Sequence, residues 1–208
     1  MGPRALLRLR KKDFMITIVS GLPRSGTSLM MQMLAAGGVP VLSDGERRAD
    51  KDNPKGYLEW ERVKELPKDP SLIAEGEGKA VKVISQLLLS LPATHQYRVI
   101  FMQRPLPEVL ASQEEMLKRR GTQDPSVNPA VIKQAFQNHL YDVNTWLNGK
   151  TNVRVLRMPY HRVLEEPRVV AQELAQFLEM PLDLDAMAAQ VDGSLYRQRV
   201  SKPVTSQP

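Results

Sequence analysis

Short apolar runs separated by longer amphipathic segments give this chain its most regular pattern. The short runs are rich in β-branched residues and are bounded by turn residues, which is typical of buried β-strands. We therefore predict strands at residues 14–19, 80–84, 97–102 and 153–156, with a weaker fifth strand at 39–42.

In the longer segments apolar residues recur every three or four positions, which predicts α-helices at residues 26–36, 105–121, 128–147 and 167–178. The segment 105–121 also carries end signals, with Pro107 near its start and three cations followed by Gly121 at its end. Strands that alternate with helices build parallel βαβ units. We therefore predict an α/β fold of three layers, a central and mostly parallel β-sheet flanked by helices, with ligands at the carboxyl ends of the strands.

Two polar segments interrupt this alternation, at residues 43–56 and 121–129. If the strand order along the chain is right, both segments reach over the carboxyl edge of the sheet. They are candidates for lids or acceptor-binding loops, and plain surface linkers are the alternative.

The composition fits one domain. The chain has 208 residues, 42% of them hydrophobic, which is enough for one sizeable core. We expect a basic N-terminal extension at residues 1–13, a single domain at 14–200 and a flexible tail at 201–208. Cysteine is absent, and no apolar run approaches the ~20 residues that a transmembrane helix needs. A cytoplasmic protein without a transmembrane segment is therefore expected.

The charge narrows the choice of partner. A net charge of +6 favours anionic partners. Aromatic residues make up only 5% of the chain, and no basic stripe is interleaved with them, so nucleic acid is not expected. A small polyanion is the better candidate.

The segment GLPRSGTSLM follows the first predicted strand and has the spacing of a phosphate-binding loop, with glycines at positions 21 and 26. An ordinary loop of this kind reads G-x-x-x-x-G-K-[ST], and its lysine reaches the β- and γ-phosphates. Here Thr27 takes the place of that lysine, and the cation is Arg24 inside the loop. Backbone N–H groups and the positive end of the following helix still make a phosphate cradle. Because the Gly26 backbone would approach the anion, a β-carbon there should crowd the phosphate.

The same segment resembles the 5′-phosphosulfate loop of sulfotransferases that use 3′-phosphoadenosine 5′-phosphosulfate (PAPS), whose consensus is P-[RK]-S-G-T-[ST]. The donor of that family ends in a sulfuryl group and needs neither a lysine for a γ-phosphate nor magnesium, so the resemblance implies no metal. It also implies that Arg24 takes part in catalysis as well as in binding. The donor-binding residues implied in the loop are Pro23, Arg24, Ser25, Gly26, Thr27 and Ser28.

Two further segments carry the resemblance. YRVIFMQRPLPEVLAS is similar to the 3′-phosphate segment of the family, in which a strand ends in Arg and a Ser follows eight residues later; Arg104 and Ser112 have this spacing. SLYRQR near the end resembles a basic segment that helps to hold the nucleotide, with a solvated basic tail as the alternative. Its candidate contacts are Tyr196, Arg197 and Arg199. The resemblance covers most of the chain from position 14 to position 199.

The resemblance does not supply a histidine base. The cytosolic branch of the family carries its base in a segment like KTHLP, and alignment of VKVISQLLLSLP places Lys82 at the family lysine and Ile84 at the histidine. Golgi-type and many bacterial members use a Glu in the stretch after the first helix. In this chain that stretch contains three candidates, in order of preference Glu59, Glu46 and Glu61.

An alternative for Glu59 is purely structural. Apolar residues in this stretch recur at helical spacing, so Glu59 and Glu61 could pair with Arg62 and Lys64 on a wet helical face.

The expected function is transfer of a sulfuryl group from PAPS to a hydroxyl or amine acceptor by in-line displacement, with a carboxylate as general base. A kinase or other P-loop NTPase is the first alternative, although both the lysine and an acidic strand end for magnesium are missing. A non-catalytic module that binds nucleotides or polyanions is the second. The acceptor and the oligomeric state are not encoded in any pattern that we recognise.

Overall fold

The computed structural model describes residues 15–47, 50, 53, 56–123 and 128–192. A parallel sheet lies at its centre, with strand order β2-β1-β3-β4. Its strands are β1 (Met15–Gly21), β2 (Ala80–Lys82), β3 (Gln96–Gln103) and β4 (Val153–Pro159). The prediction of a central parallel sheet is confirmed, and all the strands of the described residues run parallel.

The predicted fifth strand at 39–42 is wrong as an element. It is reduced to one isolated parallel bridge between Val41 and Ala80. The N–H of Ala80 donates to the carbonyl of Pro40 at 2.7 Å, and the N–H of Leu42 donates to the carbonyl of Ala80 at 2.9 Å. Because Pro40 has no N–H to donate, the ladder does not extend further toward the start of this segment.

The four predicted helices are present as α1 (Thr27–Ala36), α3 (Leu106–Arg120), α4 (Pro129–Gly149) and α6 (Pro167–Leu178). The predicted glycine stop of α3 is confirmed, since Gly121 is left-handed with φ 65°. Five shorter helices were not among the predicted elements, because segments of four to seven residues contain too few repeats of the hydrophobic period, although the helical spacing noted around Glu59 does coincide with η2. They are the 3₁₀ helices η2 (Glu61–Glu65) and η3 (Pro70–Gly76) and the α-helices α2 (Ser85–Leu88), α5 (Tyr160–Glu165) and α7 (Leu184–Ala188).

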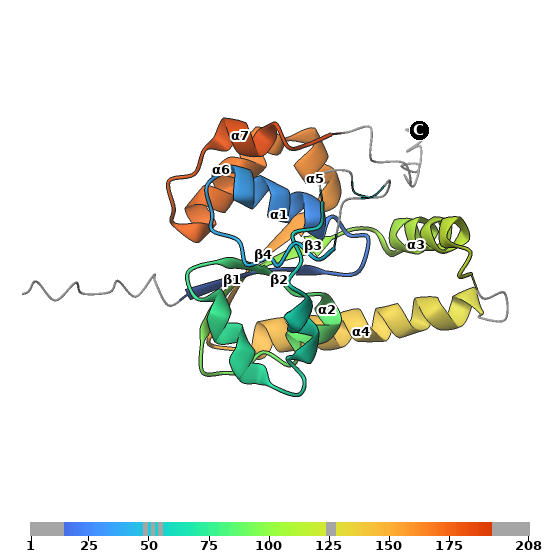
Figure 1. The fold of residues 1–208 in the computed structure, drawn as a ribbon. Coiled ribbons are helices and arrows are strands. Elements are labelled where there is room, and N and C mark those ends of the chain that lie inside the picture. The colour runs from blue at the N-terminus through green and yellow to red at the C-terminus, as the bar shows by residue number, and fades with distance from the viewer. Residues whose placement is uncertain (1–14, 48–49, 51–52, 54–55, 124–127, 193–208) are drawn as a thin grey trace, which may run out of the picture.

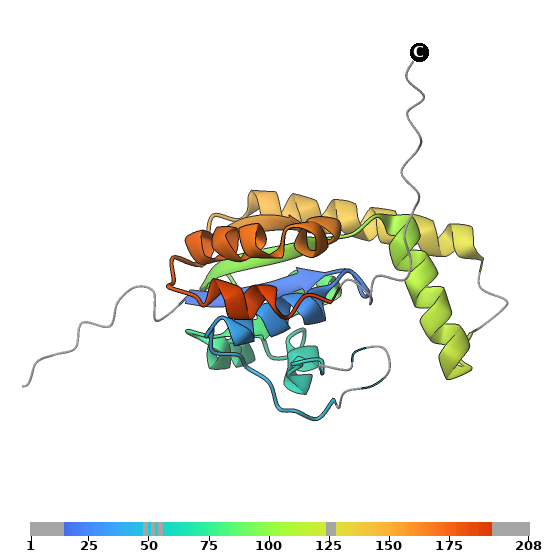
Figure 2. The ribbon, with the colours of Figure 1, turned by 90° about the horizontal axis from the view of Figure 1, so that it is seen from above.

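Helices cover both faces of the sheet, so the fold has the three predicted layers (Figure 1). α1, α5, α6 and α7 lie on one face, and α2, α4 and the two 3₁₀ helices lie on the other. α3 projects beyond the carboxyl ends of the strands, and Figure 2 shows from above that it runs at an angle away from α4. Among the described residues no helix is both long and apolar enough to cross a membrane.

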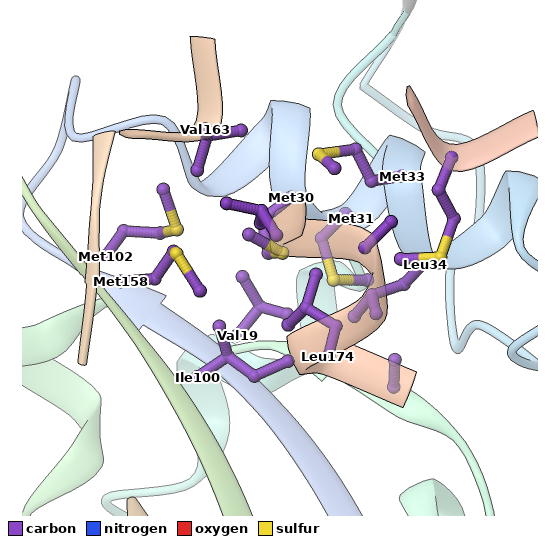
Figure 3. Packing of buried hydrophobic residues seen from close by; sticks show 14 of the residues in the cluster. Val19, Met30, Met31, Met33, Leu34, Ile100, Met102, Met158, Val163 and Leu174 are labelled. Atoms are coloured by element: carbon purple, nitrogen blue, oxygen red, sulfur yellow. The ribbon is translucent and has the colours of Figure 1, made fainter. Parts of the chain in front are cut away.

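Strand alternation assigns the strand side chains to two cores. Ile16 and Ile18 of β1 enter the core under α4, whereas Val19 faces α1 on the opposite side. The core around α1 is rich in methionine, and Figure 3 shows side chains of α1 and of the strands pointing toward one another. The labelled methionines of this core are Met30, Met31, Met33, Met102 and Met158. Flexible thioethers fill such a core without voids. This packing fixes the N-terminus of α1 at the carboxyl end of β1.

Candidate active site

A cavity of about 610 Å³ lies at the carboxyl edge of the sheet, as predicted for a parallel α/β fold. Each strand delivers a residue to it just beyond or at its carboxyl end. The loop after β1 contributes residues 23–28 in part, β2 ends in Lys82, β3 is followed by Arg104, and β4 by Tyr160. The strand order therefore brings four segments that are far apart in the sequence to one site.

Gly26 is the turning point between the loop and α1. It is the N-cap of the helix and has φ 100° and ψ 13°, a left-handed conformation that favours glycine. A β-carbon at this position would lie 2.7 Å from Cε2 of Tyr160 and closer still to Cδ2. The Tyr160 ring thus requires glycine here, and the close approach of the Gly26 backbone to a phosphate stays a prediction.

The start of α1 is suited to an anion. No side chain of the described residues caps this helix end, so its first N–H groups are available to a ligand. Thr27 and Ser28 line the cavity beside these N–H groups, as does Pro23 of the loop. A ten-residue helix also directs the positive end of its dipole toward the same point.

Ser25 is placed differently from the prediction. Its side chain does not line the cavity and is 1% exposed, with no partner for the hydroxyl among the described residues. The hydroxyl lies close to Gly21, inside the loop. Of the three hydroxyls expected at the donor, the structure therefore brings those of Thr27 and Ser28 to the cavity and turns that of Ser25 away.

The two predicted phosphate motifs are in direct contact. Arg24 Nε donates to Oγ of Ser112 at 3.0 Å, and Nη1 of Arg104 donates to the carbonyl of Arg24 at 2.9 Å. Arg104 also pairs with Glu108, whose side chain is 4% exposed, and its guanidinium lies 5.0 Å from the centre of the Tyr160 ring. Arg24, Arg104 and Ser112 all line the cavity. The contacts orient both guanidinium groups before any ligand binds.

Glu59 is held by two cations at the cavity wall. Lys82 Nζ lies 2.8 Å from Oε1 of Glu59, and Nη1 of Arg47 lies 2.9 Å from both carboxylate oxygens. Lys82 also donates to Oγ of Ser28 at 2.9 Å, so it connects the carboxylate to the start of α1. The Arg47 guanidinium stacks over Tyr57 at 3.5 Å. Lys82 therefore bridges the Glu59 carboxylate and the start of α1, which is suited to an anion.

These contacts also set the charges of the pair. Burial acts to raise the pKa of Glu59, but Lys82 and Arg47 outweigh it and hold that pKa below its ordinary value. Burial lowers the pKa of Lys82, and Glu59 opposes this shift only in part. Glu59 is thus ionised at neutral pH and is able to accept a proton.

The other carboxylate candidates are placed elsewhere. Glu46 is exposed and lines no cavity that we find among the described residues; its N–H donates to Asp44. Glu61 begins η2 and pairs with Lys64. The alternative that Glu59 pairs with neighbouring cations on a solvent-exposed helical face is therefore wrong, because Glu59 precedes η2 and faces Lys82. The same alternative is right for Glu61, which pairs with Lys64.

The polar segment 43–56 contributes to the cavity wall through Arg47 and Asn53. Gln32 of α1 anchors this segment, since its side-chain amide donates to Oδ1 of Asn53 at 3.0 Å and to the carbonyl of Gly56 at 2.7 Å. The predicted contacts Tyr196, Arg197 and Arg199 lie outside the described residues. The last described part of the chain does reach the cavity, through Gln190 and Asp192.

Sequence reasoning missed several residues of the cavity. Tyr160 follows β4, so the rule that ligands bind at strand ends would have singled it out. Arg47 had no such signal, because only the folded chain brings it to Glu59. The remaining missed cations are Arg119 and Arg120, at the end of α3.

Comparisons with known proteins identify the family and agree with the fold. The model of the family described as the sulfotransferase domain matches residues 15–206. Among solved structures, the sulfotransferase domain of the Synechococcus PCC 7002 olefin synthase aligns with a TM-score of 0.52 and 15% identity, covering 91% of this chain and 81% of that one. The sulfotransferase STF1 from Mycobacterium tuberculosis H37Rv aligns with a TM-score of 0.59 and 14% identity, covering 84% of this chain and 70% of that one. A search of curated proteins found no significant match.

Proposed function

The chain belongs to the sulfotransferase domain family. On that premise we propose that it transfers the sulfuryl group of PAPS to a hydroxyl or amine acceptor. We propose Glu59 as the general base of this reaction. The observation that carries this proposal is the contact of Glu59 with Lys82, which in turn contacts Ser28 at the start of α1. A carboxylate, a cation and an anion cradle thus follow one another across the cavity. Sulfuryl transfer needs a base for the proton of the acceptor, positive charge near the leaving oxygen and a site for the anionic donor, with the acceptor atom, the sulfur and the leaving oxygen in line.

The residues present fit a donor with two separate phosphates. The N–H groups at the start of α1, with Thr27, Ser28 and Arg24, would hold the 5′-phosphosulfate. Arg104 and Ser112 would hold the 3′-phosphate, as the family resemblance implies. No metal is needed in this scheme, because protein cations face the anionic groups.

In the proposed reaction Glu59 takes the proton of the acceptor. The acceptor oxygen or nitrogen bonds to sulfur while the bond from sulfur to the 5′-phosphate oxygen breaks, and the leaving phosphate keeps the electron pair. Lys82 lies between the base and the loop, where negative charge develops on the leaving oxygen. The products are a sulfated acceptor and adenosine 3′,5′-bisphosphate.

Two features disfavour the kinase alternative. The loop has Thr27 where a kinase loop has lysine, and the described strands end in Gly21, Lys82, Gln103 and Pro159, none of which is a magnesium ligand of the acidic kind. A non-catalytic binding module would have no use for a carboxylate held next to the cradle. We place the reaction in the cytoplasm and expect no nucleic-acid partner, because the chain lacks cysteine and is poor in aromatic residues.

A thermal-shift titration tests the proposal. Adenosine 3′,5′-bisphosphate should raise the melting temperature in the presence of EDTA, and ATP with magnesium should raise it less at equal concentration. Transfer of ³⁵S from labelled PAPS to an acceptor then tests the chemistry. A protein that responds to ATP only with magnesium, or equally to any polyanion, would not be the sulfotransferase proposed here.

A further inference from the structure

A second cavity, of about 340 Å³, adjoins the first. The two cavities share five lining residues, Arg47, Glu59, Lys82, Ile84 and Arg120. None of the residues of the anion loop lines the second cavity. Glu59 and Lys82 therefore separate a space beside the donor loop from a space that the loop does not reach.

Four apolar side chains, Trp60, Val63, Ile84 and Leu87, form part of the wall of the second cavity. Trp60 and Val63 are 4% and 8% exposed and belong to the core under α4, so they form a rigid wall. Ile84, the N-cap of α2, is 38% exposed although it is a large apolar residue. Leu87 of α2 is half-buried beside it. These four side chains offer no hydrogen bonds to a polar ligand, so the part of the wall that they form favours an apolar molecular body.

The charged groups of this cavity are unbalanced. Its lining holds the cations Arg47, Lys64, Lys82 and Arg120 and the carboxylates Glu59 and Glu61. Two of these cations face Glu59, and Lys64 faces Glu61. Arg120 lies 3.8 Å from Asp50, a long distance for an ion pair. The surplus of positive charge favours an anionic ligand over a cationic one.

We propose that the second cavity is the acceptor site, and that the acceptor is a small hydroxyl compound with an alkyl or aryl body and an anionic group. This inference rests on the proposed function. The hydroxyl would meet Glu59 at the shared wall, give its proton to that carboxylate and form the new bond to sulfur as the bond to the donor phosphate breaks. Sugars fit this lining poorly, because its apolar side chains offer no hydrogen bonds and most of its charged groups already pair with one another. Cationic amino alcohols fit it poorly because they meet like charge.

The first experiment compares four probes in the ³⁵S transfer assay with the full chain: 8-hydroxyoctanoate, 1-octanol, 8-amino-1-octanol and glucose. We expect kcat/KM to fall in that order, with glucose at the background rate. A glucose rate above that of the octyl compounds, or no transfer to any probe by protein that binds adenosine 3′,5′-bisphosphate, would overturn the inference. Failure to bind adenosine 3′,5′-bisphosphate would instead overturn the proposed function.

The second experiment uses matched variants. Leu87 lines the second cavity only, whereas Leu89, two residues later and 44% exposed, lines neither cavity. Leu87→Asp should lower kcat/KM for 1-octanol by about tenfold or more while the affinity for adenosine 3′,5′-bisphosphate stays unchanged. Leu89→Asp should leave both quantities unchanged. Equal activity of the two variants would show that the wall at Leu87 does not contact the acceptor.

The third experiment concerns charge. Lys64→Glu should reduce the preference for 8-hydroxyoctanoate over 1-octanol, and Lys68→Glu, an exposed charge reversal outside both cavities, should leave it unchanged. A preference that is unaffected by Lys64→Glu, or affected equally by both variants, would contradict the anionic part of the proposal.

Discussion

The role of Arg104 gives the most direct test of the donor site, and the structure changes how it must be tested. Arg104 is 8% exposed at its side chain and pairs with Glu108, which is 4% exposed, at 3.0 Å. Arg104→Ala would leave a buried carboxylate without this ion pair, at a cost of about 3–5 kcal/mol in folding stability. Lost nucleotide binding in that variant would therefore not be interpretable.

The double variant Arg104→Met/Glu108→Gln removes both charges together, which is much less costly than breaking the pair. If Arg104 binds the 3′-phosphate, the double variant loses a charge-assisted contact of about 1.5–3 kcal/mol. This corresponds to a Kd for adenosine 3′,5′-bisphosphate that is weaker by about 10- to 150-fold. The Kd for AMP, which lacks the 3′-phosphate, should change little.

Isothermal titration calorimetry measures both constants. Glu108→Gln alone is the matched control, and because it also breaks the buried pair, its fold is first verified by circular dichroism and thermal melting. This control keeps Arg104 and should keep the parent's discrimination between the two nucleotides. Equal losses for AMP and adenosine 3′,5′-bisphosphate in the double variant would show that Arg104 acts by holding the carbonyl of Arg24. Unchanged discrimination would remove Arg104 from the 3′-phosphate site altogether.

Three further predictions concern the base and the loop. Glu59→Gln should slow sulfuryl transfer by a factor of ~10² to 10⁴ without changing the affinity for adenosine 3′,5′-bisphosphate. If this variant turns over normally and Glu46→Gln is inactive, Glu46 is the base instead. Arg47→Ala removes a cation that lowers the pKa of Glu59, so the acid limb of the pH profile of kcat/KM should shift to higher pH. An acid limb that does not shift would argue against Glu59 as the base. Gly26→Val should abolish nucleotide binding as measured by calorimetry, because its side chain meets Tyr160; a folded variant with parental affinity would exclude this loop from the site.

The sign of the Arg47 prediction follows from the direction of the pKa shift. Glu59 must be ionised to accept a proton, and its pKa in the folded protein lies below the ordinary value. Activity is therefore lost as the pH falls through that lowered pKa. Without Arg47 the carboxylate has one cation fewer, so it takes up a proton at a higher pH.

The elements of the central sheet and its long helices could be predicted from the sequence, because each carries its own periodic signal. β3 contributes to both cores, with Val99 under α4 and Ile100 under α1, and this burial on both faces is visible in the sequence as the apolar run at 99–102. Whether the run at 39–42 forms a strand could not be predicted from the sequence. Pro40 limits the hydrogen bonds of this run only because the folded chain places the run beside β2. The short helices α2, α5 and α7 were missed because packing, rather than periodicity, defines them.

Within the site, the sequence by itself determined which residues bear the chemistry of the loop and of the strand ends. The run PRSGT and the spacing of Arg104 and Ser112 are local patterns, and a local pattern can be recognised without knowing the fold. The tertiary structure decided what no local pattern contains. It buried the Ser25 hydroxyl inside the loop, and of the three candidate glutamates it placed Glu59 2.8 Å from Lys82. Lys82 is 23 residues from Glu59 and 54 from Ser28, and the parallel pairing of β1 with β2 places Lys82 beside the loop that leads into α1.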